Sequence, residues 1–258
     1  MIPVVEIKEK AVHSGVPIST IERDYAQNHL LAALVKINMV LKGGTAIRKL
    51  YVENYRFSDD LDFTMCENIE ISTLKGKIRK AVTEAREESG INFSNRIKFE
   101  ESKSGVRVTV FFSVIQRSNN VSISIKLDIA FASREKILLN TVERKLIHPY
   151  SDILSASLKS YTLMEILLEK LRALFERTRP RDLYDIYYFR HYLYEEGFKE
   201  LFNEKCRLKG IVSDIQSVIE RKVNFKNAWE NSLHNQFKSI PQFEETYAGI
   251  IDAIEKIL

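Results

Sequence analysis

Residues 40–63 read VLKGGTAIRKLYVENYRFSDDLDF, a stretch in which a glycine pair follows one apolar segment and closely spaced aspartates begin another. The apolar residues before the glycines predict a short strand, and residues 46–51 predict a short helix after them. Glycine lets the backbone approach a phosphate closely, and the first turn of a helix offers N–H groups without intrahelical partners. Gly43, Gly44 and the hydroxyl of Thr45 therefore indicate a phosphate-binding turn. A plain tight turn with Thr45 as a helix cap is an equal alternative.

The aspartates near residue 60 are the second feature of this stretch. Residues 59–63 predict a strand, and because side chains alternate across a strand, Asp60 and Asp62 share one face while Leu61 and Phe63 share the other. Carboxylates at this spacing can converge on a pair of divalent cations, and Mg²⁺ prefers such oxygen ligands. Two aspartates by themselves fit a solvated acidic strand end better than a metal site, so a third ligand is needed.

A third carboxylate lies on the strand predicted over residues 121–131. One face of this strand is strongly apolar and consists of Ile123, Ile125, Leu127 and Ile129. Asp128 falls on the other face. If this strand lies beside the strand at 59–63, Asp128 completes a carboxylate triad with Asp60 and Asp62. Three converging carboxylates repel one another unless cations neutralise them, so the triad predicts a site for Mg²⁺ or Mn²⁺.

The rest of the chain predicts an α+β protein in two parts. Further elements expected in the first part are helices over 5–37 and 71–89, strands over 96–101 and 106–115, and a hairpin turn at 118–120. From residue 158 onward, only helical periodicity is visible. We therefore predict a mixed α/β domain over residues 1–150 and a helical domain over residues 151–258.

In the helical part, Lys170 lies within the apolar face of its helix, and Arg177 lies two turns later on the same side. An ammonium on such a face is costly unless it has an anionic partner, which a triphosphate would supply. A snorkelling lysine or a salt bridge to an acidic side chain is the alternative. In the next helix, Asp182 shares a face with apolar residues and Asp185 sits at the edge of that face. The sequence leaves open which of these two aspartates is functional.

Composition narrows the class of protein. The 258 residues carry a formal net charge of +4, which tolerates a nucleic-acid partner without requiring one. The two cysteines lie far apart and the five histidines are scattered, which disfavours a structural zinc site. No apolar segment is long enough to span a membrane and the first residues lack the apolar core of a signal peptide, so we expect a cytoplasmic protein.

The segments VLKGGTAIRKLY and YRFSDDLDF resemble the signature of the AbiEii/AbiGii toxin family, which belongs to the nucleotidyltransferase superfamily with the DNA polymerase β-like catalytic core. The family pattern is a Gly-Gly or Gly-Ser turn, a spacer and Asp-x-Asp, with a third acidic position that falls on Asp128 in KLDIAF. The segment EKLRALFERTRPRDLYDIYYF resembles the later motifs of the family, which implies roles for Lys170 and for Asp182 or Asp185. The resemblance covers roughly residues 20–195.

This resemblance implies a fold and a setting. The expected fold is a small mixed sheet flanked by helices, followed by a helical bundle, with the active site in the cleft between the two halves. The expected setting is the toxin component of a toxin–antitoxin or phage-defence pair, with a cognate antitoxin as a partner. Members of the family use NTPs, and some modify the 3′ end of tRNA. We therefore expect transfer of an NMP from an NTP to an acceptor hydroxyl, with the 3′ end of tRNA as the acceptor.

The expected site can be stated residue by residue. Asp60 and Asp62 would bind both metal ions, and Asp128 would bind the catalytic one. The nucleotide-binding residues would be Gly43, Gly44, Thr45, Lys170, Arg177 and Asp182, and the catalytic residues Asp60, Asp62, Asp128, Lys170 and Asp185. One alternative is a nucleotidyltransferase acting on proteins or small molecules, or a phosphotransferase. Another is a partner-binding module without turnover, against which the intact carboxylate set argues.

Positive charge gathers at two places, which bears on the RNA acceptor. The two clusters are Lys75, Lys77, Arg79 and Lys80, and Arg172, Arg177, Arg179 and Arg181. Such side chains would track RNA phosphates rather than read bases. The alternative is a pair of solvated helix faces balanced by neighbouring glutamates.

Overall fold

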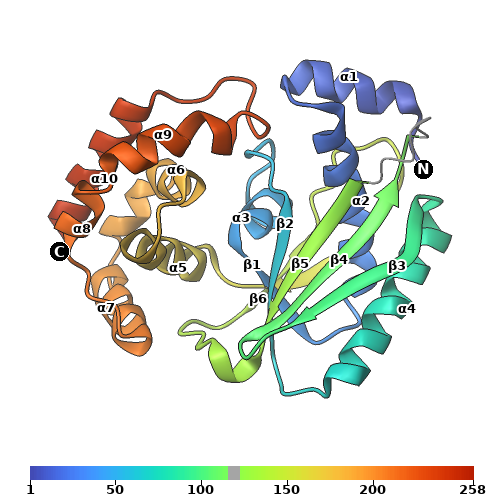
Figure 1. The fold of residues 1–258 in the computed structure, drawn as a ribbon, viewed down its shortest axis with the longest axis horizontal. Coiled ribbons are helices and arrows are strands. Elements are labelled where there is room, and N and C mark those ends of the chain that lie inside the picture. Colours follow the sequence, from blue (N-terminus) through green and yellow to red (C-terminus); the bar gives the residue numbers. More distant parts are fainter. Residues whose placement is uncertain (116–122) are drawn as a thin grey trace. The chain divides into compact units, whose positions relative to one another are not determined.

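The computed structural model (Figure 1) describes residues 1–115 and 123–258. The hairpin turn predicted at residues 118–120 lies outside the described residues. The chain forms two compact units, a first unit of Met1–Lys136 with Thr141–Tyr161 and a second unit of Ile137–Asn140 with Thr162–Leu258. The α+β fold class predicted from the sequence is confirmed.

Over the described residues, a seven-stranded mixed sheet forms the centre of the first unit, with strand order β3-β4-β5-β2-β1-β7-β6. The strands are β1 (Met39–Lys42), β2 (Asp60–Met65), β3 (Asn92–Glu101), β4 (Gly105–Ser113), β5 (Ile123–Ala130), β6 (Val142–Lys145) and β7 (Ser157–Ser160). The pairs β2–β5 and β1–β7 are parallel, and the other neighbouring strands are antiparallel. The strand at 123–130 therefore lies directly beside the strand at 60–65.

Alternation along β2 and β5 follows the sequence pattern. Leu61 and Phe63 are buried, as are all four apolar residues named for one face of β5. Asp60, Asp62 and Asp128, on the opposite faces, are each partly exposed. Burial of one face fixes which side chains point away from the core, because a shift of one residue would reverse both faces.

Helices of the first unit are α1 (Val4–Ser14), α2 (Ile18–Leu34), α3 (Gly43–Ala46) and α4 (Ile71–Ser89), with the short turns η1 (Ile47–Tyr51) and η2 (Ala132–Arg134). Leu74, Ile78 and Val82 on one face of α4 are buried, and α4 lies beside β3 (Figure 1). Helix α2 is buried over most of its length, polar residues included. Its Gln27 side chain donates to the carbonyls of Ser58 (3.0 Å) and Asp59 (3.0 Å), so α2 holds the loop that leads into β2.

The second unit is helical, with α5 (Leu163–Glu176), α6 (Pro180–Tyr188), η3 (Arg190–Tyr194), α7 (Phe198–Lys209), α8 (Ile215–Ile219), α9 (Lys222–Leu233) and α10 (Phe243–Ile257). Thr162 is the N-cap of α5, and its hydroxyl accepts from the Glu165 N–H (3.1 Å). Helix α6 begins at Pro180, which has no N–H to satisfy. The apolar face of α5 contacts α6 and α7.

Residues 157–160 differ from the sequence expectation, because they form β7 rather than the start of a helix. Leu41 on β1 is the Cα partner of Ser160, and the Leu41 carbonyl accepts from the Tyr161 N–H (3.0 Å). Backbone hydrogen bonds to the edge of β1 therefore favour a strand here over the helix that the apolar periodicity predicts. Among the described residues, no helix is both long and apolar enough to cross a bilayer.

Candidate active site

The structure brings the three predicted carboxylate positions together in the first unit. Asp62 and Asp128 are Cα partners in the parallel pair β2–β5, and Asp60 precedes Asp62 by two residues on the same face. Neighbouring strands lie about 4.8 Å apart, so the carboxylates of Asp62 and Asp128 leave the sheet side by side. The condition on which the sequence argument depended, adjacency of these two strands, is met.

The glycine turn packs directly against Asp62. Gly43 has φ +73°, and a Cβ atom at this position would lie 2.7 Å from Asp62 Oδ2. A Cβ atom on Gly44 would lie 2.6 Å from an Arg56 guanidinium nitrogen. Gly43 is therefore strained by any side chain, through its φ and through Asp62, whereas a side chain at Gly44 would have to displace the guanidinium of Arg56. The turn lies where its backbone can approach a ligand held by Asp62.

Thr45 serves the turn through its side chain. It is buried, and its hydroxyl donates to the main-chain carbonyl of Asp60, which ties the turn to the first residue of β2. Helix α3 begins after Lys42, so Thr45 lies inside the helix and does not cap it. The hydroxyl thus holds the geometry of the turn against β2.

An arginine that the sequence analysis did not single out lies at the same place. Arg107 is the Cα partner of Asp128 across β4–β5, and its guanidinium donates to both carboxylate oxygens, with distances of 2.7 and 3.2 Å. These hydrogen bonds raise the pKa of Arg107, and the positive charge neutralises Asp128. The register of β4 and β5 is the signal that would have revealed Arg107.

A buried charge network fixes the helical turn that follows the glycines. Asp24 on α2 is contacted by Arg48 Nε (2.5 Å) and Lys49 Nζ (2.7 Å), and Tyr150 donates its hydroxyl to the same carboxylate (2.7 Å). Burial alone would raise the pKa of Asp24, but the charges of Arg48 and Lys49 hold it well below its usual range. Burial lowers the pKa of Lys49 to about 8. The turn η1 is thereby anchored to α2.

In the second unit, the predicted residues form one buried ion cluster. Lys170 Nζ lies 2.9 Å from Asp182 Oδ1 and 2.6 Å from Asp185 Oδ2. Arg177 Nη2 contacts the other oxygen of Asp182 at 2.9 Å. Burial alone would raise the pKa of Asp182, but Lys170 and Arg177 together hold it well below its usual range. Both aspartates are therefore partners of Lys170, and a contact between Lys170 and a nucleotide stays a prediction.

The two basic clusters are partly paired with acidic residues. On α4, Lys75 lies 2.5 Å from Glu101 and Lys80 lies 3.9 Å from Glu84. On α5, Arg172 pairs with Glu176. These partners reduce the charge that each cluster offers, and a role in RNA binding stays a prediction.

Comparison with known proteins gives one family and one fold. The family model for the nucleotidyl transferase AbiEii toxin of type IV toxin–antitoxin systems matches residues 28–257. The solved structure of JHP933 from Helicobacter pylori is similar, with a TM-score of 0.61 and 21% identity, over 94% of this chain and 93% of that chain. The nucleotidyltransferase toxin MenT4 from Mycobacterium tuberculosis H37Rv gives a TM-score of 0.64 with 18% identity, over 100% of this chain and 90% of that chain. No curated protein sequence matches significantly.

Proposed function

The chain belongs to the AbiEii nucleotidyl transferase toxin family, and from this premise we propose that its glycine turn and carboxylates transfer a nucleoside monophosphate from an NTP to a hydroxyl of RNA. The resemblance found in the sequence is thereby confirmed, as is the nucleotidyltransferase class. The observation that carries the proposal is the adjacency of Asp62 and Asp128 across β2–β5, with Gly43 packed against Asp62.

The donor set fits a hard divalent cation. Three carboxylates on adjacent positions of one sheet face supply oxygen ligands, which are the ligands that Mg²⁺ and Mn²⁺ prefer. Asp60, Asp62 and Asp128 would hold the metal. When bound, it would supply positive charge at the attacking and leaving oxygens. Without a metal, the guanidinium of Arg107 provides positive charge beside Asp128, through two hydrogen bonds of 2.7 and 3.2 Å.

Residues of the chain bind the phosphates and take the proton of the attacking hydroxyl. The backbone of Gly43 and Gly44 binds the β- and γ-phosphates, and Thr45 keeps the turn fixed to β2. Asp128 accepts the proton of the attacking hydroxyl. That oxygen bonds to the α-phosphorus as the bond to the bridging oxygen breaks, and pyrophosphate leaves. Lys170, in its cluster with Asp182 and Asp185, is proposed to neutralise phosphate charge.

Two features support RNA as the acceptor, with the 3′ end of tRNA as the expected target. The family is one of toxins, and basic residues gather on α4 and on α5–α6. We place the activity in the cytoplasm, with a cognate antitoxin as the partner that the family description implies. Contacts to RNA phosphates release counterions, so RNA affinity falls by about 0.7 log units per contact for each tenfold rise in salt.

The experiment is incubation of the purified chain with total cellular RNA, Mg²⁺ and each α-labelled NTP in turn, followed by sizing of the labelled product. We expect a labelled band of tRNA size with α-labelled NTP and none with γ-labelled NTP. Asp62→Ala is the control that should abolish the label. A band that carries only the γ-label would identify a phosphotransferase, and label in protein or small molecules would overturn the RNA acceptor.

Salt dependence tests the RNA contacts separately. Neutralising Arg179 and Arg181 together by glutamine should flatten the slope of log affinity against log salt by about one to two units, at about 0.7 per lost contact. The matched control is Lys222→Gln with Lys226→Gln, two exposed lysines of α9 that pair with Glu244 at 2.8 Å each. A slope unchanged by the arginine changes would remove this cluster from the RNA interface.

A further inference from the structure

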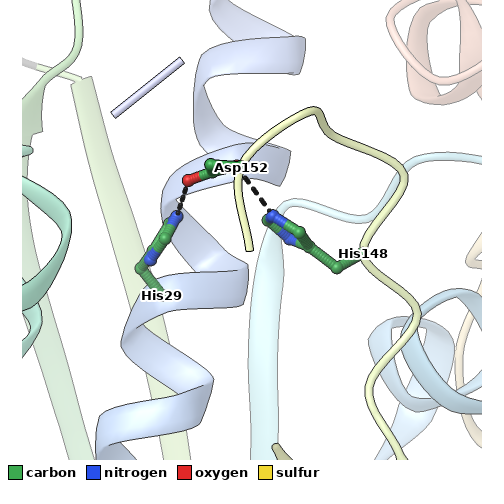
Figure 2. A group of neighbouring side chains, drawn as sticks. All are labelled: His29, His148 and Asp152. Atoms are coloured by element: carbon green, nitrogen blue, oxygen red, sulfur yellow. Dashed lines mark hydrogen bonds and ion pairs between the residues drawn. The ribbon is translucent and has the colours of Figure 1, made fainter. Parts of the chain in front are cut away.

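Two histidines and an aspartate from distant parts of the sequence meet in the first unit, apart from the carboxylates of β2 and β5. Figure 2 shows His29 on α2 with His148 and Asp152 from the segment between β6 and β7. His29 Nε2 lies 3.2 Å from Asp152 Oδ2, and His148 Nε2 lies 2.9 Å from Asp152 Oδ1. One potential ligand atom from each of the three residues lies within 4.8 Å of the others.

We propose that His29, His148 and Asp152 form a second cation site, which binds one divalent transition-metal ion of the zinc class. Two imidazole nitrogens and one carboxylate suit Zn²⁺, whereas Mg²⁺ prefers an all-oxygen set. With zinc–nitrogen bonds of about 2.0–2.1 Å, tetrahedral ligand atoms lie roughly 3.3 Å apart. Each imidazole already lies near this distance from one oxygen of Asp152, and the three ligand atoms need to draw in from at most 4.8 Å.

Burial distinguishes this cluster from an exposed group of polar residues. The side chains of His29 and His148 are 7% and 5% exposed, and that of Asp152 is 20% exposed. The imidazoles are therefore fixed by the protein, while the carboxylate keeps a path to solvent. Three protein ligands with one side toward solvent leave a fourth position for water.

A second, independent observation concerns Asn28, which is fully buried. Its Nδ2 lies 3.0 Å from His148 Nδ1 and 3.0 Å from the Ile147 carbonyl, whereas its Oδ1 has no hydrogen-bond partner among the described residues. An imidazole that binds metal through Nε2 keeps its proton on Nδ1, and that N–H needs an acceptor. In the metal-bound state, the Asn28 amide turns so that Oδ1 accepts from His148 Nδ1. The turn gives up the hydrogen bond to the Ile147 carbonyl and satisfies the unpaired oxygen.

Neighbouring residues orient the Asp152 carboxylate and identify the two segments that a bound ion would join. Tyr25 donates its hydroxyl to Asp152 Oδ2 (2.7 Å), and the Tyr25 ring lies edge-on to His29 with the ring centroids 4.8 Å apart. The segment that carries His148 also carries Tyr150, which donates to Asp24 in the network that holds Arg48 and Lys49. A bound ion would therefore cross-link α2 to this segment and stabilise the first unit.

The test uses the full chain in millimolar Mg²⁺, which occupies oxygen sites but competes poorly for imidazole. Zn²⁺ is titrated by calorimetry, and Co²⁺ serves as the spectroscopic probe. We expect one Zn²⁺ per chain, a visible Co²⁺ band typical of tetrahedral nitrogen and oxygen ligands, and a higher thermal unfolding temperature with zinc. Absence of zinc binding by the wild-type chain would overturn the proposal.

Variants then identify the ligands. His148→Gln should abolish the Co²⁺ band, and Asp152→Asn, at the partly exposed position, gives the same test if the first variant fails to fold. Asn28→Ala should weaken zinc binding about 10- to 100-fold, as expected for a residue that orients a metal ligand. His13→Gln, at an exposed histidine of α1, and Asp62→Ala should keep full binding. Binding that survives His148→Gln and Asp152→Asn, or that is lost in either control, would refute the assignment.

Discussion

Replacing Lys170 by methionine removes the ammonium from the buried cluster and keeps most of the alkyl volume. Lys170 lies 2.9 Å from Asp182 and 2.6 Å from Asp185, and all three residues are buried. In the variant, Asp185 loses this ion-pair partner and Asp182 keeps Arg177. Removing one partner of a buried ion pair costs about 3–5 kcal/mol, because a charge remains in a place that solvates it poorly. We expect the free energy of unfolding to fall by about that amount.

The assay is urea unfolding followed by the fluorescence of Trp229, the single tryptophan of the chain. Trp229 is buried in α9 of the second unit, with its ring 5.5 Å from that of Phe243, so its emission reports on the unit that holds the cluster. Lys256→Met is the matched control. Lys256 pairs with Asp252 at 2.7 Å on the exposed face of α10, and its loss should leave the unfolding midpoint unchanged.

The pH dependence separates the ion pair from simple packing. The pKa of Asp182 is held below its unfolded value of about 3.9. The pair therefore contributes its full stability above that unfolded value and loses it progressively as the pH falls from there through the lower folded-state pKa. The difference between wild type and Lys170→Met should therefore be largest near neutral pH and shrink below about pH 4. A loss of less than about 1 kcal/mol at pH 7 would refute the buried-pair reasoning. A fall in NTP affinity in the same variant would support the proposed role of Lys170 at the phosphates, and unchanged affinity with a large loss of stability would leave it a buried ion-pair partner alone.

Three further changes and one control test the first unit. Asp62→Ala should abolish NMP transfer and leave the free energy of unfolding within about 0.5 kcal/mol of wild type, because it removes one of several mutually repelling carboxylates. Normal labelling by this variant would contradict the metal-site assignment. Gly43→Ala should lose activity and about 1 kcal/mol or more of stability, because φ is +73° and the new Cβ would lie 2.7 Å from Asp62 Oδ2. The control is Gly76→Ala on α4, where a Cβ meets nothing within 4 Å, and it should instead stabilise the protein by about 0.5–1 kcal/mol. Equal effects of the two substitutions on stability would argue against the steric explanation for Gly43. Arg107→Gln should lower the Mg²⁺ concentration for half-maximal activity by up to about fivefold, because Arg107 is half exposed and competes for Asp128 with about 1 kcal/mol or less. A raised Mg²⁺ requirement would show that Arg107 supports the site.

Local sequence was enough to determine the elements and much of the candidate site. The helix predicted over residues 71–89 begins and ends where α4 does, because its apolar spacing and the glycine at its end act within a few residues. Alternation placed Asp60 and Asp62 on the face opposite Leu61 and Phe63. The glycines between the first strand and the short helix that follows it were likewise visible in the order of residues. These features depend on contacts between neighbours in sequence, so the sequence contains them directly.

The tertiary structure decided which of these elements meet. It placed Asp128 opposite Asp62 and brought Arg107 to Asp128, through strand registers that connect residues far apart in the chain. It also gave Lys170 two carboxylate partners, where the sequence left a phosphate and an ion pair as alternatives. Register and side-chain partners are fixed by burial and backbone pairing over the whole unit. No local pattern carries that information, because each residue's own neighbours in sequence are the same whichever distant strand or helix packs against it.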